Sequence, residues 1–169
     1  MADRKKTHFA AREMAFGGVM AALAAVIMCL GGLIPLATFV CPMLCMLMLK
    51  LVYGLSGHRV GWAWYAAVAV LSVLFSPDKE GAAFFVFFGA YPLLKPGLDK
   101  LPLPFLWKLL YFNALTLVMY SLLIWLFGMD ALAAEFREMG KLLLAVTLLL
   151  ANVCFFLLDM ILSRRFRRK

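Results

Sequence analysis

The sequence predicts an all-α integral membrane protein, a compact bundle of six transmembrane helices with both termini in the cytoplasm. Hydrophobic residues make up 66% of the 169 residues, and the mean hydropathy is +0.95, which leaves too little polar surface to cover a soluble globule. The apolar residues form six runs, and positive charge gathers in alternate gaps between them. We expect a single transmembrane domain over residues 1–169, with a basic cytoplasmic lead-in at 1–13 and a basic cytoplasmic tail at 164–169.

The orientation follows from the lysines and arginines. Lys79, Arg137 and Lys141 lie in one set of gaps and Lys50 lies within a span. Positively charged flanks stay in the cytoplasm, and the other thirteen of the seventeen basic residues define that side: Arg4, Lys5, Lys6, Arg12, Arg59, Lys95, Lys100, Lys108, Arg164, Arg165, Arg167, Arg168 and Lys169. Basic residues beside membrane segments contact anionic lipid headgroups. We therefore expect the lipid bilayer as a partner and no nucleic acid.

The predicted spans, in chain order, cover residues 14–36, 38–55, 60–76, 81–94, 105–127 and 140–163. A bilayer core needs about 20 helical residues, so the first, fifth and sixth spans cross it easily. The other three are short and need shelter from neighbouring helices, which predicts a compact bundle. The first span is too long for the core of a signal peptide, and we expect it to remain in the protein.

The outer connections are predicted to be short turns, except for the last. Gly31, Gly32 and Pro35 favour a tight reversal, and residues 76–80 (SPDKE) favour a second one. Residues 129–139 mix charged and apolar side chains in a pattern that predicts a short interfacial helix.

The inner connection at residues 95–104 (KPGLDKLPLP) alternates leucine with charge and contains three prolines. We expect its leucines to lie on the membrane surface while its charged side chains face water: Leu98, Leu101 and Leu103 against Lys95, Asp99 and Lys100.

Small residues form a stripe along the first span. Gly17, Ala21 and Ala25 recur every fourth residue, with Gly18 and Ala22 beside them. Such stripes allow helix backbones to approach closely. The pattern is equally compatible with packing inside the bundle and with contact to a different subunit.

The residue patterns expected of a catalytic site do not appear in the sequence. It has no Ser/His/Asp set, no paired carboxylates within the spans and no phosphate-binding glycine loop followed by Lys-Ser or Lys-Thr. Cys41 and Cys45 are one helical turn apart, but no histidine or carboxylate accompanies them at metal-ligand spacing. We expect a protein that is not an enzyme and that binds no metal or cofactor.

Polar groups inside the spans need partners, because ionisable and amide groups are costly in hydrocarbon. Lys50 is close enough to the inner end of its helix to extend its amine there. Asp159 is expected beside Lys108 or Arg164 near the inner end of the last span. Asn113 and Asn152 lie deeper, and for Asn152 both a bond to a neighbouring helix and a bond to a ligand are open, with the helix bond favoured.

Aromatic and polar residues also gather in the predicted outer half: Thr38, Phe39, Glu80, Phe84, Phe85, Tyr120 and Trp125. Aromatic walls with a few polar groups are typical of a small-molecule cavity. They are nearly as common in any membrane protein of this composition, because aromatic residues make up 14% of the chain.

The order of these pieces resembles the substrate-binding S components of energy-coupling factor (ECF) transporters. The shared features are the size, the six spans, the lead-in AREMAFGGVMAALAAVI, the turn YGLSGHRVGWAW and the pair Leu71-Ser72 before an outer turn. The segment YPLLKPGLDKLPLP matches no vitamin-specific pattern. The resemblance covers most of the chain and leaves the substrate open.

The resemblance implies a protein of the inner (plasma) membrane that binds a vitamin-like micronutrient from outside. It would work with a membrane coupling subunit and ATPase subunits, which Gly17, Ala21 and Ala25 would help to contact. The residues expected to line the substrate site are Thr38, Glu80, Phe84, Trp125, Thr147 and Asn152.

Two other functions fit the same pattern. The first is a non-transporting scaffold of the cell envelope, similar to the rod-shape-determining MreD proteins in size, span number and topology. The second is a small channel, which the lack of a polar stripe through several helices disfavours.

Overall fold

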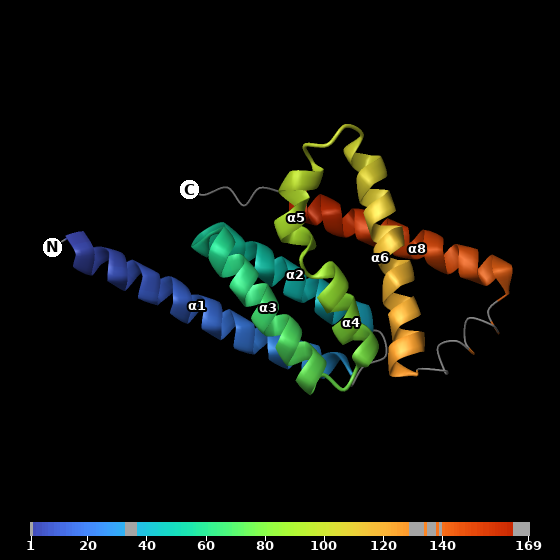
Figure 1. Ribbon diagram of the computed structural model, residues 1–169, viewed down its shortest axis with the longest axis horizontal. Coiled ribbons are helices and arrows are strands. Elements are labelled where there is room, and N and C mark those ends of the chain that lie inside the picture. The colour runs from blue at the N-terminus through green and yellow to red at the C-terminus, as the bar shows by residue number, and fades with distance from the viewer. Residues whose placement is uncertain (1, 33–36, 129–133, 135–137, 139, 164–169) are drawn as a thin grey trace. The chain divides into compact units, whose positions relative to one another are not determined.

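The computed structural model describes residues 2–32, 37–128, 134, 138 and 140–163, and every regular element in these residues is a helix. The helices, labelled in Figure 1, are α1 (Ala2–Gly31), α2 (Ala37–Ser56), α3 (His58–Phe75), α4 (Lys79–Phe88), α5 (Tyr91–Leu98), α6 (Pro104–Phe127) and α8 (Lys141–Ser163). The predicted interfacial helix at 129–139 falls almost entirely outside the described residues.

Within the described residues, six helical segments are long and apolar enough to cross a membrane, which confirms that each of the six predicted spans is an apolar helix. They are Met14–Gly31, Ala37–Ser56, His58–Phe75, Lys79–Leu98, Pro104–Trp125 and Lys141–Ser163. Most of the predicted boundaries agree within a few residues. The lead-in is also helical, since α1 begins at Ala2 and continues into the first span. The cytoplasmic location of both termini stays a prediction.

The fourth span is made of two helices. α4 ends at Phe88, and α5 starts again at Tyr91 after Gly89 and Ala90. Pro92 explains the break, because it has no backbone N–H to continue the hydrogen-bond ladder. The span then runs on to Leu98, so the prediction that Lys95 faces water in a connecting loop is wrong: Lys95 is a buried residue of α5.

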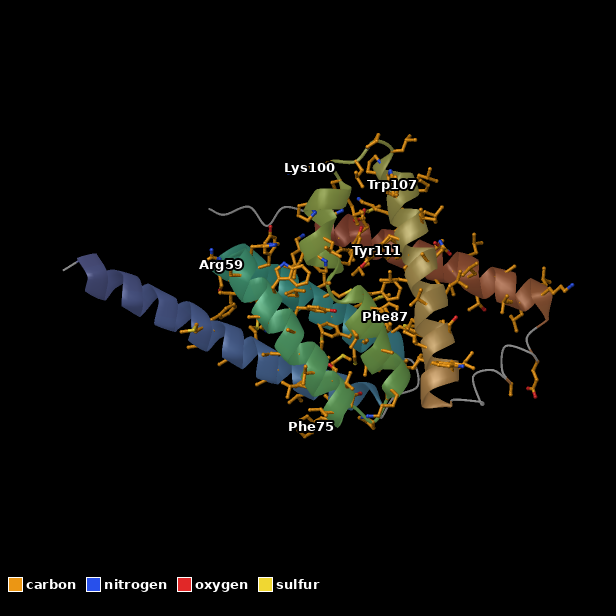
Figure 2. All side chains as sticks on the ribbon, in the orientation of Figure 1. Arg59, Phe75, Phe87, Lys100, Trp107 and Tyr111 are labelled. Atoms are coloured by element: carbon orange, nitrogen blue, oxygen red, sulfur yellow. The ribbon has the colours of Figure 1, made fainter. Side chains whose placement is uncertain are left out.

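Residues Met1–Pro96 and Gly97–Lys169 form two compact units, called unit 1 and unit 2 below. In unit 1, α1 lies along α2 and α3, and α4 packs on α2 and α3 (Figure 1). The centre of this unit is apolar and includes Ala24, Cys45, Met46, Leu49, Val52, Val68 and Phe85. Side chains crowd the space between these helices in Figure 2, in which Arg59 and Phe75 mark the two ends of α3.

Small residues set the helix spacing in unit 1. α3 buries Gly61, Trp64, Val68 and Ser72 at helical period. A Cβ atom on Gly61 would stand 3.0 Å from Leu93 Cδ2 and 3.3 Å from Tyr53 Cβ. Lipid tails are as apolar as leucine, so moving a leucine from lipid to a helix contact gains no hydrophobic free energy. Helices in a membrane therefore associate through close packing of this kind.

In unit 2, α6 and α8 cross one another (Figure 1). Two pairs of stacked rings lie between the first half of α6 and the second half of α8. Their centroids are 4.6 Å apart in both pairs, Phe112 with Phe155 and Phe105 with Phe156. By contrast, every residue from 140 to 150, at the start of α8, is exposed.

Candidate functional site

A polar turn joins α3 to α4 at one end of unit 1. The Asp78 carboxylate accepts a 3.0 Å hydrogen bond from Gly81 N and so caps the start of α4. The Lys79 amine donates to the carbonyls of Val73 and Ser76 at 3.0 and 3.1 Å, which caps the end of α3. This turn corresponds to the SPDKE segment, which the sequence predicts on the outer side.

Ser76 attaches this turn to α1. Its buried hydroxyl is 3.1 Å from the carbonyl oxygens of both Met28 and Asp78. Gly32 lies beside the turn as well, because a Cβ atom there would stand 3.2 Å from Asp78 N. Three helices therefore meet at this end of unit 1.

The turn brings α4 against the first residues of α2. A Cβ atom on Gly81 would stand 2.8 Å from the Thr38 carbonyl oxygen, so glycine permits this approach. One turn further along α4, the Phe84 ring meets the Phe39 ring edge-on with centroids 5.5 Å apart. Phe84 is buried, while Thr38 and Glu80 are half-buried.

Three of the six predicted site residues thus lie in one place. We call Thr38, Phe39, Glu80, Phe84 and Phe88 the α2–α4 cluster. Phe88 extends its aromatic wall, with a ring centroid 4.7 Å from that of Phe84. The cluster combines a half-buried threonine and a half-buried glutamate with three phenylalanines, a composition that suits a small ligand with both polar and apolar parts.

Sequence reasoning missed Asp78. Its Oδ1 atom caps α4, but its Oδ2 atom is buried and has no hydrogen-bond partner among the described residues. The available signal was the Ser-Pro-Asp motif before a helix, since aspartate is favoured at the position that caps a helix.

The other three predicted site residues belong to unit 2. Trp125 on α6 is 85% exposed. Thr147 on α8 is also exposed, and its hydroxyl donates 2.9 Å to the Leu143 carbonyl of its own helix. Whether these residues line a ligand site stays a prediction.

Asn152, the last of the six, forms a bond between helices. Its amide nitrogen donates to Asn113 Oδ1 at 3.3 Å, and the Asn113 nitrogen donates to Asn152 Oδ1 at 3.0 Å. Each nitrogen also donates 2.8 Å to the carbonyl four residues earlier in its own helix. All the amide hydrogens of the pair are therefore used, and the favoured interpretation, a helix-to-helix bond, is confirmed.

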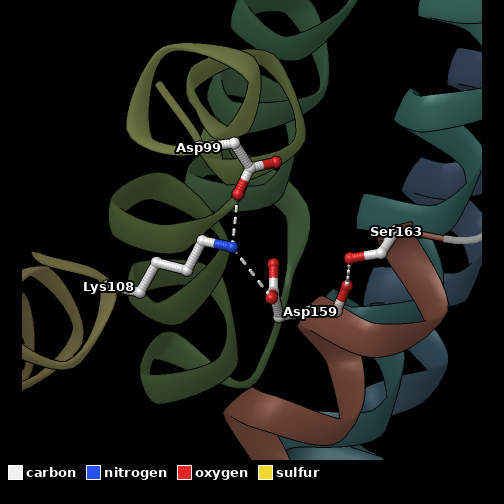
Figure 3. A network of polar contacts seen from close by, with 4 residues as sticks. All are labelled: Asp99, Lys108, Asp159 and Ser163. Atoms are coloured by element: carbon white, nitrogen blue, oxygen red, sulfur yellow. Dashed lines mark hydrogen bonds and ion pairs between the residues drawn. The ribbon is translucent and has the colours of Figure 1, made fainter. Parts of the chain in front are cut away.

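An ionic cluster lies further along the same crossing (Figure 3). The Lys108 amine is 3.0 Å from Asp159 and 2.5 Å from Asp99. The Lys108 side chain is 9% exposed and that of Asp159 14%. The prediction that Asp159 lies beside Lys108 or Arg164 is confirmed for Lys108. Asp99 is exposed, as expected, and its carboxylate also contacts Lys108.

The small-residue stripe of α1 is divided between two surroundings. Gly17 is buried, and a Cβ atom there would stand 3.7 Å from Val60 Cγ1 of α3. Ala21 and Ala25 are half-buried. The neighbouring small residues, Gly18 and Ala22, are exposed. Internal packing therefore accounts for the start of the stripe, and a subunit contact through its exposed flank stays a prediction.

Histidine and cysteine take part in local packing. His58 accepts a 2.9 Å hydrogen bond from the Trp62 indole, and Cys45 lies 3.6 Å from the Ala24 carbonyl. Within the described ranges, no three His, Cys, Asp or Glu side chains gather as a metal site would require.

No protein-family model matches this chain. Neither a curated protein nor a solved structure matches it.

Proposed function

We propose that this chain is the substrate-binding membrane subunit of an ECF-type uptake transporter for a vitamin-like micronutrient. The observation that carries the proposal is the α2–α4 cluster, in which Thr38 and Glu80 lie next to the edge-to-face rings of Phe39 and Phe84. Six helices of membrane-spanning length support the same class. The short motifs of the lead-in and of the turn between α2 and α3 also fit it.

The cluster favours a ligand with a hydrogen-bond donor or a positive charge. Glu80 stands in the first turn of α4 and is half-buried. A partly desolvated carboxylate interacts more strongly with a donor than one in open water does. The adjoining rings would hold the apolar part of the ligand.

The proposal includes partners, because the sequence carries no nucleotide-binding loop of its own. A membrane coupling subunit and ATPase subunits would supply the energy. The exposed small residues Gly18 and Ala22, next to Ala21 and Ala25, offer a surface on α1 that another helix backbone can approach closely. Both termini would lie in the cytoplasm of a plasma-membrane protein.

Purification of the full chain tests the proposal. Gentle detergent extraction is expected to recover coupling and ATPase subunits together with a small molecule, which mass spectrometry of the extracted ligand would identify. Recovery of neither a ligand nor ATPase subunits would contradict the proposal.

A non-transporting envelope scaffold is the second candidate, and one observation favours it. The deep polar residues Asn113 and Asn152 bond to each other and to their own helices, so the deepest amides of unit 2 act in helix packing. A scaffold is expected to co-purify with cell-wall enzymes and to carry no small molecule.

A further inference from the structure

Residues 99–103 connect α5 to α6 and have fewer buried anchors than the turn between α3 and α4, whose Ser76 hydroxyl is buried. This segment makes a pair of backbone bonds at its start, from Lys100 N to Gly97 O and from Leu101 N to Leu98 O, each 3.2 Å. All its residues are exposed. We call this segment the strap. Figure 2 labels Lys100 within it and Trp107 in the first turn of α6 that follows.

One side chain of the strap reaches a buried partner. Asp99 contacts the Lys108 amine of α6, and the same amine holds Asp159 of α8 (Figure 3). The backbone carbonyl of Asp159 also accepts a 2.7 Å bond from the Ser163 hydroxyl, one turn later in α8. Two carboxylates from different elements therefore share a single ammonium group.

The two carboxylates differ in surroundings. The Asp159 side chain is 14% exposed and sits on a long helix, while the Asp99 side chain is 43% exposed and sits on a short loop. Water competes for an exposed ion pair and weakens it. The Asp159 contact is thus the better shielded of the two, and the Asp99 contact is the one that water can replace more easily.

The backbone of the strap favours opening as well. Leu103, between two prolines, has a φ of 60° and a ψ of 60°. Left-handed backbone is unfavourable for a residue with a branched side chain such as leucine. The Leu103 side chain is 70% exposed, and the conformation is held by backbone bonds at the start of α6, in which the Leu103 carbonyl accepts from Leu106 N at 3.0 Å and from Trp107 N at 3.3 Å. Strain stored at this position lowers the free-energy cost of opening the strap.

We propose that the strap is a releasable latch on the predicted cytoplasmic side of unit 2, closed by Asp99 on Lys108 and opened without unfolding the α6–α8 crossing. Opening frees Leu101 and Leu103 to move away from the helices while Lys108 keeps its partner Asp159. The latch is independent of what the α2–α4 cluster binds.

Limited trypsin digestion of the full chain in nanodiscs tests this latch. Within the strap trypsin has one cleavable bond, Lys100–Leu101, and mass spectrometry measures its rate of cleavage. The preceding lysine, Lys95, is followed by proline and resists cleavage. When opening is fast, the cleavage rate follows the population of the open state.

Asp99→Ala is expected to raise the rate of cleavage at Lys100 about fivefold, the full effect of a weak ion pair, while the melting temperature stays unchanged. Asp99→Glu should restore the slow rate, and Glu138→Ala, which removes a carboxylate elsewhere, should have no effect. Asp159→Ala should instead lower the melting temperature.

Two further measurements separate a latch from a static contact. Leu103→Asn relieves the left-handed strain, since asparagine tolerates this conformation, and should slow cleavage below the wild-type rate. Raising the salt concentration from about 0.05 M to about 0.5 M should speed cleavage of the wild type more than that of Asp99→Ala, because salt screens exposed charges. An unchanged rate in Asp99→Ala, or a melting temperature that falls as far as in Asp159→Ala, would overturn the proposal.

Discussion

The two units are held together by different means. In unit 1, glycines allow backbones to come close, as at Gly61 and Gly81, and the hydroxyls that bridge its helices donate to backbone carbonyls, Tyr65 to Val86 and Ser76 to Met28. In unit 2, polar side chains bridge the helices themselves, through Asn113 with Asn152 and Lys108 with Asp159. Unit 1 should therefore be sensitive to changes in size, and unit 2 to the loss of a polar partner.

The largest effect is expected from Lys108→Met in unit 2. This change leaves the Asp159 and Asp99 carboxylates without the ammonium that both contact. Removing one partner of a buried ion pair lowers stability by about 3 kcal/mol or more. Unfolding of the protein in detergent measures the effect, and Lys100→Met in the exposed strap is the matched control, with an expected change of about 0.5 kcal/mol or less. Equal effects of the two variants would show that the ion pair adds nothing.

A smaller effect is expected from Gly81→Ala in unit 1. The new Cβ atom would stand 2.8 Å from the Thr38 carbonyl oxygen, so α4 must move away from α2. Overpacking of this kind costs about 1–3 kcal/mol. Gly54→Ala is the control, because a Cβ atom there meets no other atom within 4 Å. If Gly81→Ala were as stable as Gly54→Ala, the close approach of α4 to α2 would be wrong.

The asparagine pair should contribute least. Polar bonds between helices in membranes average about 0.6 kcal/mol, because the separated helices also find partners. We expect Asn113→Ala and Asn152→Ala each to lower stability by about that amount. A double-mutant cycle should give a coupling of similar size. Additive effects of the two changes would mean that the bond contributes nothing to unit 2.

Much of the fold was predictable, because hydropathy and charge report directly on span number and position. Asp159 was also placed correctly beside Lys108, since both had to lie near the same end of their helices. The contact between Asp99 and Lys108 was not predicted, because it depends on the path of the strap around Leu103, and local sequence does not encode that path. Lys95 was misplaced because the prolines of this region suggested a loop, whereas the helix resumes at Tyr91 and continues through Pro92 and Pro96.

The candidate site was only partly predictable. Depth and side suggested Thr38, Glu80 and Phe84, which the turn at Asp78 does bring to one end of unit 1. The contact between α2 and α4 that gathers them depends on the small size of Gly81, and a single glycine in an apolar run is not a specific signal. For Asn152, depth alone did not distinguish a ligand contact from the bond with Asn113.

The most direct test of the proposed function compares the affinities of Glu80→Gln and Asn152→Ala for a ligand. The ligand is the small molecule extracted from the purified protein, and both variants are titrated below their melting temperatures. If the α2–α4 cluster binds the ligand through a partly desolvated carboxylate, Glu80→Gln should weaken binding by about 1–3 kcal/mol. Asn152→Ala, in the region held together by polar bonds, should keep the wild-type affinity. The opposite result, unchanged affinity in Glu80→Gln and lost affinity in Asn152→Ala, would contradict a ligand site in unit 1.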